Sequence, residues 1–154
     1  MMIAMTLFGK YKENRLKYVK DYYDAISQFY ISLPTPIMAG VRTPTRQFSS
    51  CVLIESGDSL DSINSTATSI VRYISKKAGI GIGAGSIRAN GAKVGDGSVV
   101  HTGLIPFLKY FQSAVKSCSQ GGVRGGAATV YLPLWHYEFE DLVVLKNNKG
   151  VEET

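Results

Sequence analysis

Apolar residues repeat at helical spacing in the first part of this chain, which predicts a helix. Between Glu13 and Tyr30 they recur at three- and four-residue spacings, which is typical of an amphipathic helix with Asn14 at the N-cap position. Prolines at 34 and 36 end that helix, because proline and the residue before it favour extended backbone. We therefore expect a helical lead-in over residues 1–32 and a short strand over residues 37–39.

The central part of the chain predicts a strand, a helix and a second strand. Residues 51–54 are apolar at every position between polar segments, which is typical of a short strand buried on both faces. Residues 59–77 then repeat at helical spacing, and we expect Asp58 or Ser59 to cap this helix and Gly79 to end it. Strand, helix and strand in this order predict a parallel sheet with a right-handed crossover.

Two glycine-rich segments follow. In residues 79–91 glycine occupies every second position from Gly79 to Gly85, at first in alternation with isoleucine, and Arg88 follows, so one backbone face lacks side chains and a ligand or a packed strand can approach it. This segment is neither a dinucleotide fingerprint nor a P-loop, because its glycines follow a helix and no Gly-Lys-Ser/Thr comes after them. In residues 117–128 two glycine pairs flank Arg124, which combines amide donors and a guanidinium with a backbone of several available shapes.

Regular patterns surround these glycines. His101 precedes a segment, residues 104–115, in which apolar residues repeat at helical spacing, and residues 127–132 predict a further strand. Residues 135–145 fit a helix, although strand alternation is also present there. Residues 90–97 predict a polar, glycine-rich loop with Lys93 that is mobile until another group orders it.

Composition narrows the class of protein. At 154 residues and 45% hydrophobic content, the chain is long enough for one domain with a real core. The net charge of +5 is spread along the chain and aromatics do not interleave with the basic residues, so we expect no polynucleotide partner. There is no apolar run of about 18 residues to span a membrane and no secretory signal pattern, so we expect a cytoplasmic protein. Two cysteines and two histidines at unrelated spacings predict no metal site.

Three residues are candidates for chemistry or binding, and each also has a simpler interpretation. Cys51 leads a strand beside two serines and could be a reactive group at the mouth of an α/β barrel, or a small buried apolar side chain. Thr35 is held between two prolines and could contact a ligand phosphate, or be a solvated turn hydroxyl. Asp58 compensates a helix dipole whether or not it binds anything.

Several long motifs occur together and in a fixed order. They are Leu33-Pro34-Thr35-Pro36-Ile37-Met38, Arg42-Thr43-Pro44-Thr45-Arg46-Gln47-Phe48-Ser49-Ser50-Cys51, Gly57-Asp58-Ser59-Leu60-Asp61 and Ser117-Cys118-Ser119-Gln120-Gly121-Gly122-Val123-Arg124-Gly125-Gly126-Ala127-Ala128. With these motifs the chain resembles the large (catalytic, alpha) subunit of class I ribonucleoside-diphosphate reductase. The resemblance implies an α/β fold: the first part, about half, of a ten-stranded α/β barrel with parallel strands and crossover helices. In that scheme residues 33–154 carry the barrel strands, helices and specificity loops.

The resemblance also implies roles for single residues. Cys51 resembles the family's redox cysteine, which helps to protonate the departing 2′-hydroxyl and ends as half of a disulfide, whereas Cys118 matches a cysteine without a redox role. The residues that resemble substrate contacts are Thr35, Ser50, Cys51 and Gly79. Those that resemble contacts to the effector's base and ribose are Asp58, Ser59 and Leu60, and Arg88 resembles its phosphate contact on the first specificity loop. Ser119 to Gly126 resemble the second specificity loop, with Gln120 and Arg124 as its moving contacts.

The family's other active-site residues, among them the radical cysteine and the second redox cysteine, lie further along than this chain reaches. The resemblance therefore implies several partners: the remaining large-subunit polypeptide, a metal-containing small subunit that supplies the radical, a thioredoxin- or glutaredoxin-type reductant, and a second alpha subunit. It implies ribonucleoside diphosphate substrates and dNTP or ATP effectors, with no cofactor bound by this chain. The alternative is a non-enzymatic nucleotide-binding fragment or an inactive remnant.

Overall fold

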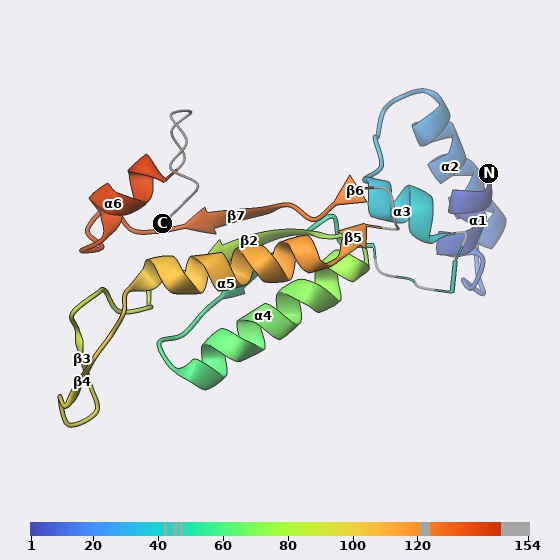
Figure 1. The fold of residues 1–154 in the computed structure, drawn as a ribbon. Helices are drawn as coiled ribbons and strands as arrows, with labels where there is room; N and C mark the ends of the chain where they lie inside the picture. The colour runs from blue at the N-terminus through green and yellow to red at the C-terminus, as the bar shows by residue number, and fades with distance from the viewer. Residues whose placement is uncertain (42, 45, 47, 121–123, 146–154) are drawn as a thin grey trace. The chain divides into compact units, whose positions relative to one another are not determined.

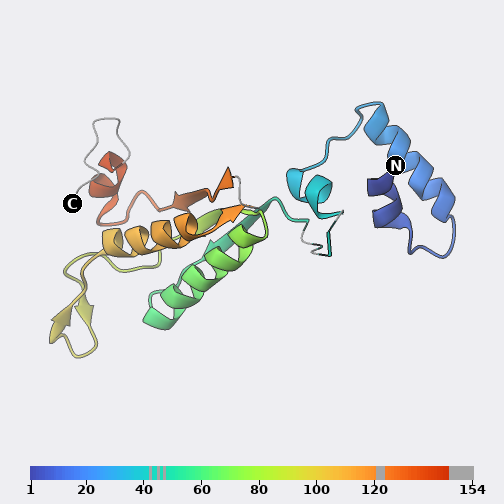
Figure 2. The ribbon, with the colours of Figure 1, turned by 45° about the vertical axis from the view of Figure 1, so that its right-hand side comes forward.

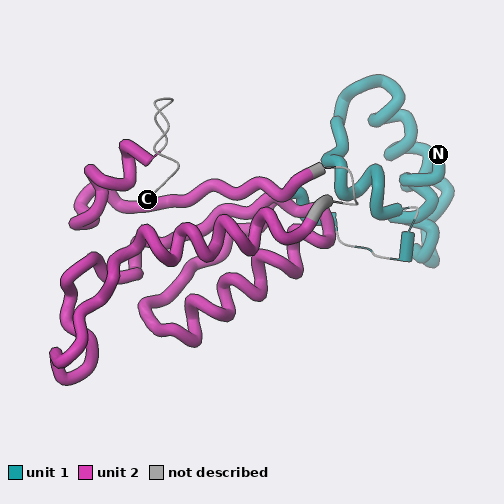
Figure 3. Tube along the Cα trace, viewed as in Figure 1, with its two compact units in different colours: residues 1–50 teal, residues 51–154 magenta. Residues whose placement is uncertain are grey.

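The structure of the chain is a computed structural model that describes residues 1–41, 43, 44, 46, 48–120 and 124–145 (Figure 1). For Ser119, Gln120 and Arg124 it describes the backbone alone. The chain divides into two compact units, Met1–Ser50 and Cys51–Thr154 (Figure 3), and each is described by itself. No helix in the described residues is both long enough and apolar enough to cross a membrane.

The first unit is helical. It contains α1 (Met2–Phe8), α2 (Arg15–Ser27) and α3 (Thr35–Gly40). α1 and α2 pack through aromatic rings, with the Phe8 ring centroid 5.1 Å from that of Tyr22. The helix predicted between Glu13 and Tyr30 is thus confirmed as α2, but Asn14 at its N-cap has a left-handed φ of 53° and makes no side-chain capping bond.

The short strand predicted over residues 37–39 is wrong, because these residues belong to α3. Pro34 is extended and serves as the N-cap, and Pro36 lies in the first turn of the helix. A proline is tolerated there, since the first helical N–H groups have no partner within the helix and the fixed φ of proline suits a helix. The two prolines therefore start a helix where we expected them to prevent one.

The second unit is built on a parallel sheet. Its strands are β1 (Cys51–Glu55), β2 (Gly79–Gly83) and β7 (Ala128–Tyr131), in the order β1-β2-β7. Cys51 lies opposite Gly79 in the register of the first pair, and Ile80 lies opposite Ala128 in the second. The parallel sheet predicted from the strand-helix-strand pattern is confirmed, as is a strand within residues 127–132.

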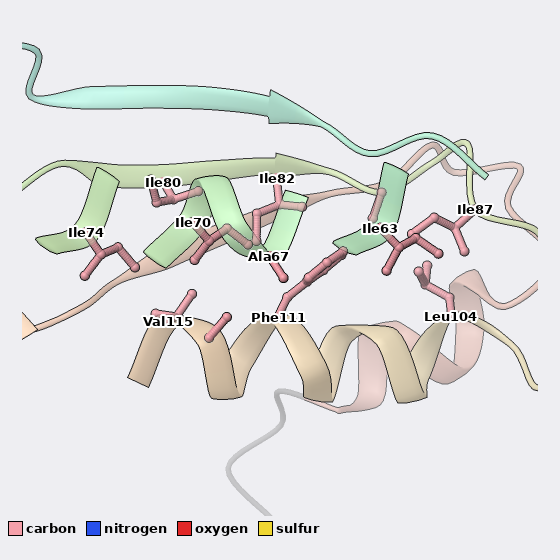
Figure 4. Close-up of a cluster of buried hydrophobic side chains, with 12 residues drawn as sticks. Ile63, Ala67, Ile70, Ile74, Ile80, Ile82, Ile87, Leu104, Phe111 and Val115 are labelled. Carbon is pink, nitrogen blue, oxygen red and sulfur yellow. The ribbon is translucent and has the colours of Figure 1, made fainter. Parts of the chain in front are cut away.

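Two helices, α4 (Leu60–Ser75) and α5 (Leu104–Ser117), lie side by side on one face of this sheet (Figures 1 and 2). Figure 4 shows the core between them, where isoleucines of α4 and β2 point toward Phe111 and Val115 of α5. Ile70 and Ile74 are fully buried and Phe111 is 1% exposed. Burying one such side chain contributes roughly 1.5–3 kcal/mol, so this single-sided core fixes the helices to the sheet.

The expectation that β1 is buried on both faces is wrong for the described residues. Val52 and Ile54 pack against the core, whereas Cys51, Leu53 and Glu55 are exposed, and Leu53 retains 76% of its accessible surface. Side chains alternate between the two faces of a strand, and α4 and α5 cover one face. The other face of the sheet, which we call the open face, carries Cys51, Leu53 and Glu55.

The ends of α4 also differ in part from prediction. Ser59 is the N-cap, and its hydroxyl accepts the Ser62 N–H at 3.1 Å, so the serine and not Asp58 caps the helix. The helix ends at Ser75 with Lys76 as C-cap. Gly79 does not end it, because Lys77 takes the left-handed turn with a φ of 72° and leaves Gly79 to begin β2.

Two short hairpins and one helix complete the second unit. Strands β3 (Lys93–Val94) and β4 (Val99–Val100) form one hairpin, and β5 (Ser119–Gln120) and β6 (Arg124–Gly125) form the other. The polar segment 90–97 is thus part of a hairpin, in which the Ser98 hydroxyl and N–H lower the pKa of Asp96. α6 (Phe139–Val144) occupies the end of the segment 135–145, so the helical interpretation of that segment holds over a shorter length.

Candidate functional site

The parallel sheet has two chemically different ends. Its strands begin at Cys51, Gly79 and Ala128, which define the starting end. They finish at Glu55, Gly83 and Tyr131, which define the finishing end. Because all three strands are parallel, loops that precede strands gather at the starting end and loops that follow them gather at the finishing end. The candidate residues therefore fall into two groups.

At the starting end, a thiol lies beside a glycine. Cys51 is exposed and forms no disulfide, and in the register of the sheet it lies opposite Gly79. The strand register therefore brings together two of the residues that resemble substrate contacts. Thr35 begins α3 and Ser50 ends the first unit, so the site described here, built from the second unit, does not include them.

The segment that resembles the second specificity loop leads into the starting end. Its backbone pairs Ser119 with Gly125 and Gln120 with Arg124 in the β5–β6 hairpin, and residues 121–123 lie outside the described residues. Close to β7, the Ala127 carbonyl accepts the Ile80 N–H at 3.2 Å. The loop is thus tied through the backbone to the strand that begins at Gly79.

The alternating glycines of β2 have a physical explanation on the open face. A Cβ atom added at Gly81 would lie 2.5 Å from Leu53 Cδ2 and 3.0 Å from Tyr131 Cε2. A Cβ at Gly83 would collide with the Glu55 carboxylate. Side chains of the neighbouring strands therefore lie over the glycines. The sequence allowed either a ligand or a packed strand at this backbone face, and these contacts are those of packed strands.

At the finishing end, Asp58 and Arg88 hold each other. Asp58 Oδ1 accepts the Arg88 backbone N–H at 2.9 Å and Oδ2 accepts Arg88 Nε–H at 2.7 Å. Arg88 Nη1 also donates to the Lys93 carbonyl at 2.8 Å. The side chains are 35% and 31% exposed for Arg88 and Asp58, so the ion pair itself is worth at most about 1 kcal/mol. Its main effect is to orient the arginine.

The start of α4 lies directly after this ion pair in sequence. Ser59 uses its hydroxyl as the helix cap, and Leu60 is 70% exposed although it begins a helix. An exposed leucine offers an apolar surface for the flat face of a ring, and a helix N-terminus favours a negatively charged group. Asp58, Ser59 and Leu60 are consecutive in sequence and Arg88 is bonded to the first of them, so these four residues lie together at the finishing end.

A hollow of about 580 Å³ lies beside Arg88. It is bounded by residues 85–92, which follow β2, and by Pro133 and residues 135–137, which follow β7. Trp135 and Tyr137 are 84% and 96% exposed, and the His136 ring bonds the Ile87 carbonyl at 2.9 Å. The sequence patterns considered above did not point to these three residues. The available signal was the Trp-His-Tyr run shortly after β7, because ligands of open α/β sheets bind beyond the carboxyl ends of parallel strands.

Among the described residues, no group of three or more His, Cys, Asp or Glu is placed to hold a metal ion.

The two ends of the sheet are joined by the helices of the core. At about 1.5 Å per residue, α4 and α5 each span roughly 20–25 Å. Each helix begins near the finishing end and returns the chain to the starting end, where Gly79 and Ser119 follow.

Comparison with known proteins assigns both units. A family model described as "Ribonucleotide reductase, all-alpha domain" matches residues 1–46, and one described as "Ribonucleotide reductase, barrel domain" matches residues 49–154. These two matches meet close to the division between the units after Ser50.

Curated relatives agree with the family models. The chain is 70% identical, over 154 residues, to ribonucleoside-diphosphate reductase subunit alpha of Haemophilus influenzae. It is 67% identical over 153 residues to ribonucleoside-diphosphate reductase 1 subunit alpha of Escherichia coli and to subunit alpha of the enterobacteria phage T4 enzyme. Each match covers 99% of this chain and 20% of the relative, so the chain spans about one fifth of the length of these relatives. The resemblance inferred from the motifs is confirmed, and the chain belongs to the ribonucleotide reductase large-subunit family.

Proposed function

We propose that this chain supplies the first part of the catalytic barrel of a ribonucleoside-diphosphate reductase, which replaces the 2′-hydroxyl of ribonucleoside diphosphates with hydrogen. The observation that carries the proposal is the separation of two residue groups on one sheet. Cys51 and Gly79 resemble substrate contacts and lie at the starting end, whereas Asp58 and Arg88 resemble effector contacts and meet at the finishing end. Further strands from the remaining large-subunit polypeptide would complete a ten-stranded barrel over the open face.

Cys51 is proposed as one of two cysteines that reduce the substrate. It and a second cysteine from the remaining polypeptide each give up one proton and one electron, a disulfide forms between them, the 2′-hydroxyl leaves as water and a hydrogen takes its place on the 2′-carbon. A thioredoxin- or glutaredoxin-type protein then reduces the disulfide, and a metal-containing small subunit supplies the radical that starts the reaction. The exposed, unpaired thiol on the open face supports this role, because the second cysteine must approach to a Cα separation of about 4.4–6.8 Å.

The other proposed contacts divide between substrate and effector. Thr35, Ser50 and Gly79 would contact the ribonucleoside diphosphate. A dNTP or ATP effector would place its base and ribose against Asp58, Ser59 and Leu60 and a phosphate against Arg88. Ser119, Gln120 and Arg124 would relay effector identity to the substrate base, in an enzyme with two alpha subunits. The exposed Leu60 and the orientation of Arg88 by Asp58 support the effector site.

The test is Cys51→Ser in the enzyme assembled from this chain, the remaining large-subunit polypeptide and the small subunit. We expect multiple turnover to be lost, because serine cannot form the disulfide. Cys118→Ser is the matched control and should turn over like the unmodified enzyme, since Cys118 has no proposed redox role. Full activity of Cys51→Ser would refute the role of the thiol. An unmodified assembly that binds deoxynucleotides but reduces no substrate would favour the non-enzymatic nucleotide-binding alternative.

A further inference from the structure

A buried carboxylate lies behind the proposed effector site and belongs to no motif. Glu138 precedes α6 and is 8% exposed. Its Oε2 accepts the backbone N–H of Leu104 at 2.8 Å and that of Asn90 at 3.1 Å. These donors lie 34 and 48 residues away in sequence, so the carboxylate joins segments that are remote along the chain. Hydrogen bonds to an ionised acceptor are about twice as strong as neutral ones.

The two donors stand on either side of one structural feature, the hairpin arm formed by residues 91–103. Asn90 is the last residue before the arm and Leu104 is the first residue of α5 after it. Within the arm, the Gly91 N–H donates to the His101 carbonyl at 2.9 Å and the His101 N–H donates to the Ala92 carbonyl at 2.8 Å. A single carboxylate oxygen of Glu138 therefore closes the base of the arm from outside.

Glu138 also supplies the cap that α5 lacks locally. Gly103 is the N-cap of α5 and has no side chain to accept a helix N–H. Its φ of +94° favours glycine, and a Cβ there would lie 2.5 Å from Glu138 Oε1 and 3.0 Å from Asn90 Cβ. The glycine thus leaves the space that the carboxylate needs to reach the helix N-terminus, where negative charge is stabilising.

A histidine from the same segment holds the backbone of Glu138. The Glu138 N–H donates to His136 Nδ1 at 3.2 Å, so the ring proton is on Nε2, which donates to the Ile87 carbonyl at 2.9 Å. Ile87 is buried in the core and immediately precedes Arg88. Residues 136–138 are therefore bonded both to the segment after β2 that carries Arg88 and to the start of α5.

We infer that Glu138 is a positioning residue that clamps the hairpin arm to the N-terminus of α5, so that effector binding at Arg88 moves the arm and α5 as one unit. The arm is linked to Arg88 through the Lys93 carbonyl, and the far end of α5 leads into Ser119 and the second loop. The clamp thus connects the proposed effector end of the sheet to the proposed substrate end. This inference rests on the proposed function, because the effector and the substrate are those of a ribonucleoside-diphosphate reductase.

Two substitutions test the clamp in the assembled enzyme. Glu138→Ala removes the acceptor, and we expect the effector-dependent change in preference among the four ribonucleoside diphosphates to shrink about fivefold or more. Glu138→Gln keeps a carbonyl oxygen that can accept both N–H groups, so it should retain most of that dependence. Glu140→Ala is the matched control, because Glu140 lies two residues further along and is exposed. It should respond to effectors like the unmodified enzyme.

A second measurement needs no substitution and covers the case in which Glu138→Ala does not fold. Amide hydrogen exchange of the unmodified enzyme, with and without a deoxynucleoside triphosphate, should slow in residues 88–100 and also in residues 101–108 and 134–139. Slowing confined to residues 88–100 would overturn the clamp.

The outcomes for the clamp and for the proposed function are distinct. If the unmodified enzyme changes substrate preference with effector and Glu138→Ala changes it equally, the clamp is wrong and the proposed function stands. A loss of thermal stability in Glu138→Ala with intact effector dependence would likewise reduce Glu138 to a purely structural role. An unmodified assembly that reduces substrate without any effector response would overturn the proposed effector site, and the clamp with it; one that reduces no substrate would overturn the proposed function itself.

Discussion

The two ends of the β1-β2-β7 sheet hold their candidate residues in different ways. At the finishing end, Arg88 bonds both oxygens of Asp58 and the Lys93 carbonyl, and Glu138 bonds two backbone N–H groups. At the starting end, Cys51 has an exposed, unpaired thiol, and its neighbour in the register, Gly79, has no side chain.

This difference matches what the two proposed roles require. In an effector site, donors and acceptors that are already oriented before the ligand binds lower the conformational entropy lost on binding. A redox cysteine must instead stay accessible to the substrate, to a second cysteine and to an external reductant. The exposed apolar side chains of Leu53 and Tyr131 on the same sheet fit the proposal that further barrel strands cover the open face.

Both ends of the sheet depend on the core between the helices and the sheet. A core substitution should therefore disrupt the candidate residues at both ends alike. Phe111 of α5 is 1% exposed and packs between the helices and β2. We expect Phe111→Ala to lower the free energy of unfolding by about 3–5 kcal/mol, measured by denaturant titration of the assembled catalytic subunit. Tyr110→Ala is the control, since Tyr110 is 44% exposed, and it should cost much less. Equal losses for the two variants would mean that this core does not support the sheet.

A glycine substitution should affect the finishing end alone. In Gly103→Ala, the left-handed φ of +94° and the collision with Glu138 should together cost about 1–3 kcal/mol and weaken effector binding. Gly95→Ala is matched to it, because Gly95 also has a positive φ, of +58°, but a Cβ there meets nothing within 4 Å. Calorimetric unfolding and effector titration compare the two. If Gly95→Ala weakened effector binding as much as Gly103→Ala, backbone strain and not the contact with Glu138 would be responsible.

Local sequence patterns predicted the frame of the second unit well. The helical spacing in α4 and α5 is strong because each helix buries one continuous apolar face against the sheet. The strand-helix-strand order then required β1 and β2 to be parallel, which places Cys51 and Gly79 at one end. The family motifs supplied the roles of these residues, which spacing alone left open.

The errors of prediction have physical causes. Prolines 34 and 36 are compatible with extended backbone and with the first turn of a helix, so their positions could not decide the conformation of residues 37–39. The apolar run of β1 predicted two buried faces, but α4 and α5 cover only one of them in the described residues. Asp58 had a sufficient explanation as a helix cap, and its bond to Arg88, 30 residues away, has no local signal. The same holds for Glu138 and Leu104, which only the tertiary fold brings together.

In the proposed division of roles, the finishing end of the sheet binds the effector and the starting end performs the chemistry. The decisive measurement is the effector affinity of the assembled enzyme, determined by titration calorimetry for Arg88→Ala and Cys51→Ser. A charge-assisted hydrogen bond is worth about 1.5–3 kcal/mol, so we expect Arg88→Ala to raise the effector Kd by about tenfold or more. Cys51→Ser should leave that Kd within about twofold of the unmodified value, although it stops turnover, because the thiol lies at the opposite end of the sheet from the proposed effector contacts. An unchanged Kd in Arg88→Ala, or an equal loss of affinity in Cys51→Ser, would contradict the division of roles between the two ends.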